Sequence, residues 1–191
     1  MLCRFAAERA DGLAPFLADV RALFADPPGP QLVLVERDPE AVARWVALAT
    51  GALPARHAAE LTFTTYTRRP YRCGQSVLGI RPDAEFSFGP VELQHHYRVR
   101  HGLGGPSSPV ADDLWAELAA AVWLAGRVEL FARAAGPEGE FATGRLAALA
   151  LAAGVPVGAA AAREAADWVC ARPAAPPSPN PRAARTSSGT A

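Results

Sequence analysis

The 191-residue sequence contains no lysine, so all 19 of its basic side chains are arginines. It also has a single isoleucine, Ile80, while alanine, glycine and proline are abundant. Selection of arginine for bidentate contacts with anions is one explanation. A coding sequence rich in G and C, whose codons favour Ala, Arg, Gly and Pro, is the other. Because the bias extends to uncharged residues, we favour the second explanation, and arginine content alone does not predict an anion site.

The sequence has no excess of either charge, since 19 acidic residues balance the 19 basic ones. Nucleic-acid-binding domains usually carry a basic excess on one face, so we expect no nucleic-acid partner. Neither a signal peptide nor an apolar run of the ~20 residues that cross a bilayer is present. The alanine-rich residues 146–162 come closest, but Gly154 and Pro156 interrupt them. We therefore expect a cytoplasmic protein without a membrane partner.

Cysteine is scarce, and Cys3, Cys73 and Cys170 are too far apart for a metal or redox motif. We expect free thiols, as is usual in a reducing compartment. The sequence also lacks the P-loop and the glycine-rich dinucleotide motif. We accordingly expect neither a metal nor an organic cofactor.

The first hundred residues predict a mixed α/β fold. Apolar residues recur at helical spacing over residues 13–25, and residues 31–35 form a short apolar run typical of a buried strand. Asp38 and Pro39 then start a helix, with Asp38 as N-cap and Val42, Trp45 and Val46 on its inner face. A second strand is predicted over residues 61–66, which completes a βαβ-like unit.

Two further strands are predicted at residues 75–80 and 91–100, with a short extended piece at residues 86–88 between them. Residues 91–100 show the clearest alternation of apolar and polar side chains in the chain. We expect these strands to be added to the βαβ-like unit in antiparallel orientation.

Beyond the glycine-rich joint at residues 102–106 the pattern becomes helical. Ser108 and Pro109 are placed to start a long helix that Gly136 ends, with Asp112, Asp113 and Glu117 offsetting the helix dipole near its start. Two shorter helices are predicted at residues 145–153 and 159–170. The remaining residues lack apolar periodicity. The expected organisation is a mixed α/β segment (1–101), a helical segment (107–171) and a disordered tail rich in Pro, Ala, Ser and Arg (172–191).

The candidate binding site is an arginine- and tyrosine-rich loop after the strand at residues 61–66. We name this the Arg/Tyr loop and define it by its candidate contact residues: Tyr66, Arg68, Arg69, Tyr71 and Arg72. Guanidinium groups and phenol hydroxyls in such proximity suit a carboxylate, a phosphate or an acidic partner loop. The alternative is an ordinary solvated turn, in which the tyrosine rings pack down and the arginines stay in water.

Catalytic and metal sites have weaker support. His95 and His96 are neighbours on a predicted strand and would point to opposite faces, so with His101 they do not form a metal site. The catalytic alternative is a thiol nucleophile at Cys73 assisted by a histidine such as His95, but Cys73 begins no helix that would activate it. We therefore expect no catalytic residues, and a small Cys- or His-dependent hydrolase or transferase is the alternative.

The stretch from residue 31 to residue 82 carries a more specific pattern. Its landmarks are Leu53-Pro54, the run TFTTY that ends at Tyr66, Pro70-Tyr71-Arg72 and the run GIRP that ends at Pro82. Over about residues 30–135 the chain resembles the middle portion of the GTPase-associated protein family of actinobacteria. The resemblance implies one module of a larger multidomain protein, encoded beside a GTPase in a bacterial conflict or regulatory system.

The resemblance implies a non-catalytic interaction or scaffolding role, with a GTPase encoded nearby as the partner. It transfers no catalytic residues to this sequence. Because the chain starts almost at the module and ends in the predicted tail, where the family pattern has more domain, we expect either a truncated gene product or a fragment of a longer protein.

Overall fold

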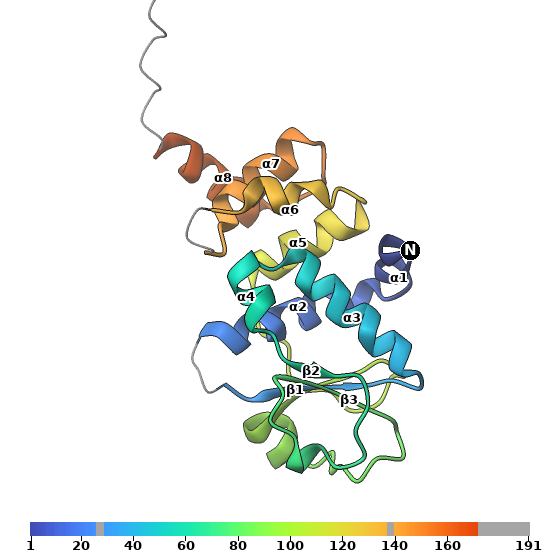
Figure 1. Cartoon of the computed structure of the whole chain (residues 1–191). Coiled ribbons are helices and arrows are strands. Elements are labelled where there is room, and N and C mark those ends of the chain that lie inside the picture. The colour runs from blue at the N-terminus through green and yellow to red at the C-terminus, as the bar shows by residue number, and fades with distance from the viewer. Residues whose placement is uncertain (26–28, 137–139, 172–191) are drawn as a thin grey trace, which may run out of the picture.

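The computed structural model describes residues 1–25, 29–136 and 140–171. Within them, a four-stranded sheet has helices on one face and two long connecting loops on the other (Figure 1). The predicted mixed α/β fold class is confirmed. The predicted disordered tail, residues 172–191, lies outside the described residues.

The sheet has the order β2-β3-β1-β4, with strands β1 (Gln31–Val35), β2 (Phe63–Thr64), β3 (Val77–Ile80) and β4 (Tyr97–His101). All three pairings among these described strands are parallel, so the expected antiparallel additions are wrong. The reason lies in the connections: residues 65–76 and 81–96 are long enough to carry the chain back to the edge where β1 starts. The apolar run of β1 is central and buried, as its sequence predicts.

The predicted strand at residues 91–100 is wrong in its first half. Residues Glu92–His96 form one π-helical turn, η2, and only Tyr97–His101 pair as β4. Leu93 packs against the small apolar cluster under the sheet from this turn. An alternating pattern of five residues therefore fits a turn with one partly buried side chain as well as it fits a strand. The predicted strand at residues 61–66 likewise pairs over two residues only.

Eight α-helices and one 3₁₀ turn, η1, complete the described residues. Their bounds are α1 Leu2–Glu8, α2 Ala10–Ala25, α3 Pro39–Ala52, α4 Ala55–Glu60, η1 Pro70–Arg72, α5 Leu114–Leu124, α6 Glu129–Ala134, α7 Thr143–Ala152 and α8 Ala159–Cys170. Helix α3 starts as predicted, because the Asp38 side chain accepts a hydrogen bond from the Glu40 N–H.

The single long helix expected between Ser108 and Gly136 is wrong. Helix α5 begins after Asp113, whose side chain accepts a hydrogen bond from the Ala116 N–H. It ends at Leu124, and Gly126 then adopts a left-handed conformation with φ of +67° before α6. A residue with positive φ interrupts a helix, and glycine adopts it without steric cost.

The two faces of the sheet are covered differently. A large core on the helix face contains Phe16, Trp45, Trp115 and Leu146, and so joins helices from both halves of the chain. The other face carries a small cluster formed by side chains of β1, β3 and β4, which the loops at residues 65–76 and 81–96 cover. These loops contain the Arg/Tyr loop. Across the described part of the chain, no helix has both the length and the apolar character required to span a bilayer.

Candidate functional site

The Arg/Tyr loop occupies the connection between β2 and β3. All five of its candidate residues are exposed, with relative exposures of 39% for Tyr66 and 52% for Tyr71. The structure therefore brings the predicted residues onto one connection at the surface.

Hydrogen bonds hold the backbone of this loop. The Thr67 N–H donates to the Gly79 carbonyl over 2.8 Å, the Arg69 N–H to the Thr67 hydroxyl over 3.2 Å, and the Arg72 N–H to the Arg69 carbonyl over 3.1 Å. The loop approaches β3 so closely that a Cβ atom at Gly79 would overlap the Thr65 carbonyl. A side chain other than hydrogen at Gly79 would therefore displace the loop.

Tyr71 anchors a second segment to the loop. Its ring stacks on Phe86 with centroids 5.6 Å apart, and it meets Tyr97 edge-on. The Tyr71 hydroxyl accepts a hydrogen bond of 2.8 Å from the Ser87 N–H. Tyr71 thus fixes the position of the segment at residues 85–87.

Two of the three arginines, Arg68 and Arg69, line a hollow of about 390 Å³ together with Thr67 and Glu85. Arg69 Nε lies 3.8 Å from Glu85 Oε2, and both side chains are largely exposed. The side chains of Arg68 and Arg72 make no ion pair or hydrogen bond with other residues in the described part. Free guanidinium groups on a fixed backbone can bind a carboxylate or phosphate. The packed Tyr71 ring and the solvated arginines also fit the alternative of an ordinary turn.

The histidines do not converge on one point in the described residues. His96 is exposed on η2, and the side chain of His95 lies outside the described part. His101 is half-buried at the end of β4, where its Nδ1 accepts a hydrogen bond from the Leu103 N–H. Burial lowers the pKa of His101, and the nearby Glu36 carboxylate opposes this shift. No group of three His, Cys, Asp or Glu side chains in the described ranges is close enough to hold a metal.

The surroundings of Cys73 give no support to a thiol nucleophile. Its Sγ lies 3.4 Å from the Thr67 hydroxyl and 3.6 Å from the Arg69 carbonyl. Neither group is a general base, whereas an activated cysteine needs an adjacent imidazole or a comparable base.

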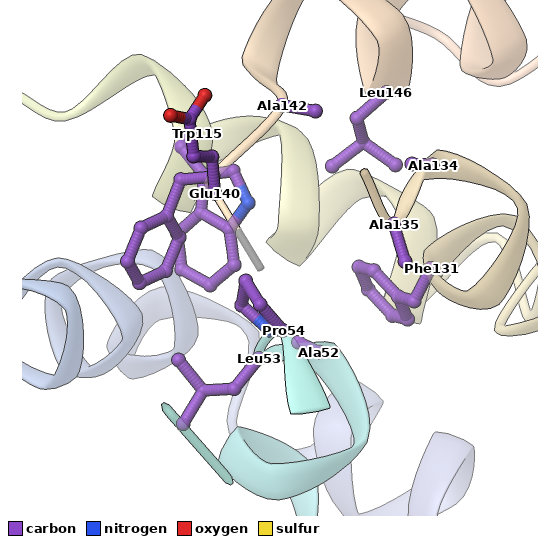
Figure 2. A pocket seen from close by; sticks show the side chains of 11 residues that line it. Ala52, Leu53, Pro54, Trp115, Phe131, Ala134, Ala135, Glu140, Ala142 and Leu146 are labelled. Carbon is purple, nitrogen blue, oxygen red and sulfur yellow. The ribbon is translucent and has the colours of Figure 1, made fainter. Parts of the chain in front are cut away.

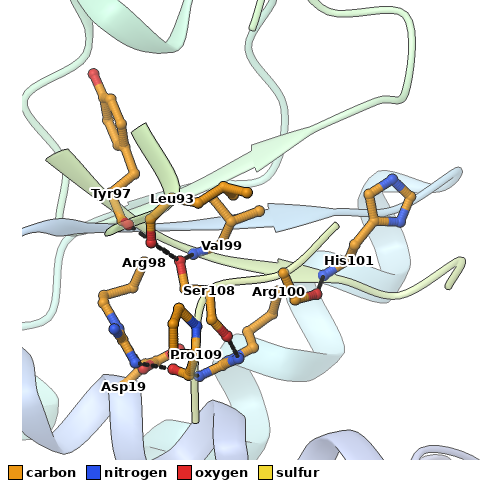
Figure 3. A network of polar contacts seen from close by, with 10 residues as sticks. Asp19, Leu93, Tyr97, Arg98, Val99, Arg100, His101, Ser108 and Pro109 are labelled. Atoms are coloured by element: carbon orange, nitrogen blue, oxygen red, sulfur yellow. Dashed lines mark hydrogen bonds and ion pairs between the residues drawn. The ribbon is translucent and has the colours of Figure 1, made fainter. Parts of the chain in front are cut away.

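A buried network of ion pairs and hydrogen bonds lies along the β4 edge of the sheet (Figure 3). Asp19 of α2 is 1% exposed and forms ion pairs with Arg98 Nε at 2.8 Å and Arg100 Nε at 2.6 Å. Ser108, which the sequence placed at a helix start, instead donates to the Leu93 carbonyl and accepts from the Val99 N–H. The two arginines compensate the charge of Asp19, and Ser108 satisfies the backbone at the edge strand. We therefore assign this network a structural role.

Asp19 is not among the residues predicted from the sequence, although the sequence contains a signal for it. An acidic residue within the apolar stripe of one helix, and two arginines two positions apart on one strand, together predict a buried ion pair. Glu36 was missed in the same way. It is 3% exposed and accepts hydrogen bonds from Trp45 Nε1 at 2.9 Å and from Arg9 at 3.3 Å.

A second hollow lies where the C-terminal helices meet the first half of the chain (Figure 2). Leu53 and Pro54 line it from one side, and Trp115, Phe131 and Leu146 from the other. Its volume of about 30 Å³ admits a water molecule but no larger ligand. It is therefore a packing gap between elements rather than a ligand site.

Two family models match this chain. Residues 2–101 match the middle domain of GTPase-associated protein 1, and residues 123–186 match its C-terminal domain. The middle-domain match thus begins earlier and ends earlier than the resemblance over residues 30–135 that the sequence pattern indicates. Neither the curated proteins nor the solved structures contain a protein that matches this chain.

Proposed function

This chain belongs to the GTPase-associated protein 1 family, and from that premise we propose that it is a non-catalytic interaction or scaffolding module that works with a GTPase encoded nearby. The chain would act in the cytoplasm as part of a bacterial conflict or regulatory system, as the resemblance to the actinobacterial family implies. We further propose that the mixed α/β segment (1–101) and the helical segment (107–171) are its two structural parts.

One observation carries the proposal: the Arg/Tyr loop combines exposed arginines with a fixed backbone. A preorganised loop loses less conformational entropy on binding than a flexible one. Arginine and tyrosine are also the residue types that most often dominate binding at protein interfaces. The loop is therefore the contact that we propose for the GTPase.

The test removes the three positive charges of the loop from the full chain, in the variant Arg68→Ala/Arg69→Ala/Arg72→Ala. We expect its melting curve to stay near that of the wild type, because exposed ion pairs contribute only ~0–1 kcal/mol. Capture of the GTPase encoded beside the gene should fall at least about tenfold, as loss of a desolvated interface arginine implies. Circular dichroism and a quantitative pull-down measure the two effects.

The matched control removes three exposed arginines elsewhere, as Arg56→Ala/Arg133→Ala/Arg163→Ala. It changes the net charge equally and should leave capture unchanged. Equal capture by the loop variant and the wild type would exclude the loop as the contact. Collapse of the loop variant would show that the arginines stabilise the fold, and failure of the wild-type chain to capture the GTPase would contradict the proposed function itself.

A further inference from the structure

Glu85 is the one acidic residue that lines the hollow of the Arg/Tyr loop. It comes from the connection between β3 and β4, whereas Thr67, Arg68 and Arg69 come from the connection between β2 and β3. At the hollow, a carboxylate from outside the loop therefore already meets the guanidinium group of Arg69.

Two contacts hold Glu85 at this place through its backbone. The Glu85 N–H donates to the Arg68 carbonyl over 3.2 Å. The next two residues, Phe86 and Ser87, are fixed by the ring and the hydroxyl of Tyr71. These contacts keep the Glu85 side chain near Arg69, although that side chain is 73% exposed.

The ion pair between Arg69 and Glu85 is nevertheless weak. Its N···O distance of 3.8 Å is longer than a hydrogen bond, and the side chains are 62% and 73% exposed. Exposed pairs of this kind contribute little, so a better-placed acceptor can replace Glu85 at small cost. A bidentate carboxylate on Arg69 would be such an acceptor.

We propose that Glu85 is an internal competitor, whose carboxylate pairs with Arg69 at the hollow until a carboxylate on the surface of the partner GTPase displaces it. The inference rests on the proposed function and specifies the chemistry of the contact. Glu85 is then a specificity-determining residue, because a carboxylate of the partner binds Arg69 only if it outcompetes the Glu85 carboxylate.

The charges favour an acidic protein surface as the occupant. Two arginines, Arg68 and Arg69, line the hollow together with a single acid, Glu85, whereas the whole chain has a formal net charge of zero. This small local excess of positive charge favours binding of a few carboxylates. It is much smaller than the basic surface that tracks a nucleic-acid backbone.

The test measures the affinity of the full chain for the GTPase at low ionic strength, using wild type, Glu85→Gln, Arg69→Ala and the double variant. Removal of the competitor should tighten binding about two- to fivefold, as expected for loss of one exposed ion pair. Arg69→Ala should weaken binding. In the double variant, Glu85→Gln should have no further effect, because its competition acts through Arg69.

Glu129→Gln is the matched control, since Glu129 also forms an exposed pair, with Arg127 at 2.7 Å, but lies on α6. It removes the same charge and should leave the affinity unchanged. Equal tightening by Glu129→Gln would overturn the inference, because the effect would then be one of net charge. Unchanged or weaker binding by Glu85→Gln would overturn it as well.

A probe separates this inference from the proposed function. A decapeptide of glutamate should bind Glu85→Gln more tightly than wild type, even if the GTPase does not bind the chain at all. A ten-residue oligothymidylate should bind both proteins more weakly than the peptide does. Stronger binding of the oligonucleotide would overturn the assignment of a protein carboxylate as the occupant.

Discussion

At the residue scale, the buried carboxylates of Asp19 and Glu36 show how this chain tolerates charge in its core. Each accepts contacts from two side chains of other elements: Asp19 from two arginines, and Glu36 from Trp45 and Arg9. A buried charge that loses one partner destabilises the protein, since the remaining charge is left uncompensated. These residues therefore fix the position of α2, α3 and β4 relative to one another.

Trp45 provides a test at this scale. It is 6% exposed, packs against Phe5 and Phe16, and donates to Glu36. Trp45→Ala should lower the free energy of unfolding by ~3–5 kcal/mol, as truncation of a large core side chain does. Trp45→Phe keeps an aromatic ring but removes the N–H, so it should cost ~1–3 kcal/mol. Denaturation in urea measures both, and equal costs for the two variants would contradict a separate contribution from the hydrogen bond.

At the scale of elements, side-chain caps mark the starts of α3 and α5. The sequence offers Asp112 and Asp113 side by side, and only the structure distinguishes them. Asp113 caps α5 and forms an ion pair with Arg21 of α2 at 2.9 Å. Asp112 is exposed and makes no contact of either kind within the described ranges.

Asp112 and Asp113 allow a matched comparison of two neighbouring substitutions. Asp113→Ala should destabilise the protein by ~1–2 kcal/mol through loss of the N-cap and the ion pair. Asp112→Ala, one residue earlier, should change the free energy of unfolding by less than about 0.5 kcal/mol. Thermal and urea denaturation of both variants would check this. A larger effect at Asp112 would mean that the helix starts earlier than the structure places it.

At the scale of the whole molecule, the two matched family domains share one core on the helix face of the sheet. Helix α5 packs against α1 and α2, and Trp123 approaches Gly51 of α3 closely. The His57 ring of α4 stacks on Phe141 and contacts Phe24 at a tilted angle, and these two phenylalanines lie on opposite sides of this junction in the sequence. Burial of apolar surface between the parts couples their stabilities.

We therefore expect the described residues to unfold as one unit. A chain ending at residue 105 would expose the surface that α5 covers, and it should lack a cooperative thermal transition. A chain ending at residue 171 should retain one. Circular dichroism and calorimetry of the two chains and the full protein would decide, and two separated transitions in the full protein would show that the parts are independent.

Several features of the fold could be predicted from the sequence because they depend on neighbours in the chain. The apolar run of β1, the Asp38 cap of α3 and the helical period of α8 all follow from residues within a few positions. The candidate loop was also located in this way, because a strand followed by arginines and tyrosines is a local pattern. Its binding role remains a prediction.

Other features depended on residues far apart. The parallel direction of the strands, the turn at η2 and the use of Ser108 at the β4 edge required the path of the whole chain. The same holds for Glu85, which meets Arg69 because its own N–H and the contacts of Tyr71 hold the next connection against the loop. The sequence by itself determined the class of fold, the start of α3 and the location of the loop, since periodicity and capping act locally. Only the tertiary structure decided the direction of the strands and the presence of Glu85 at the hollow. Both depend on contacts between segments that are distant in the sequence, and such contacts form where they allow both segments to be buried.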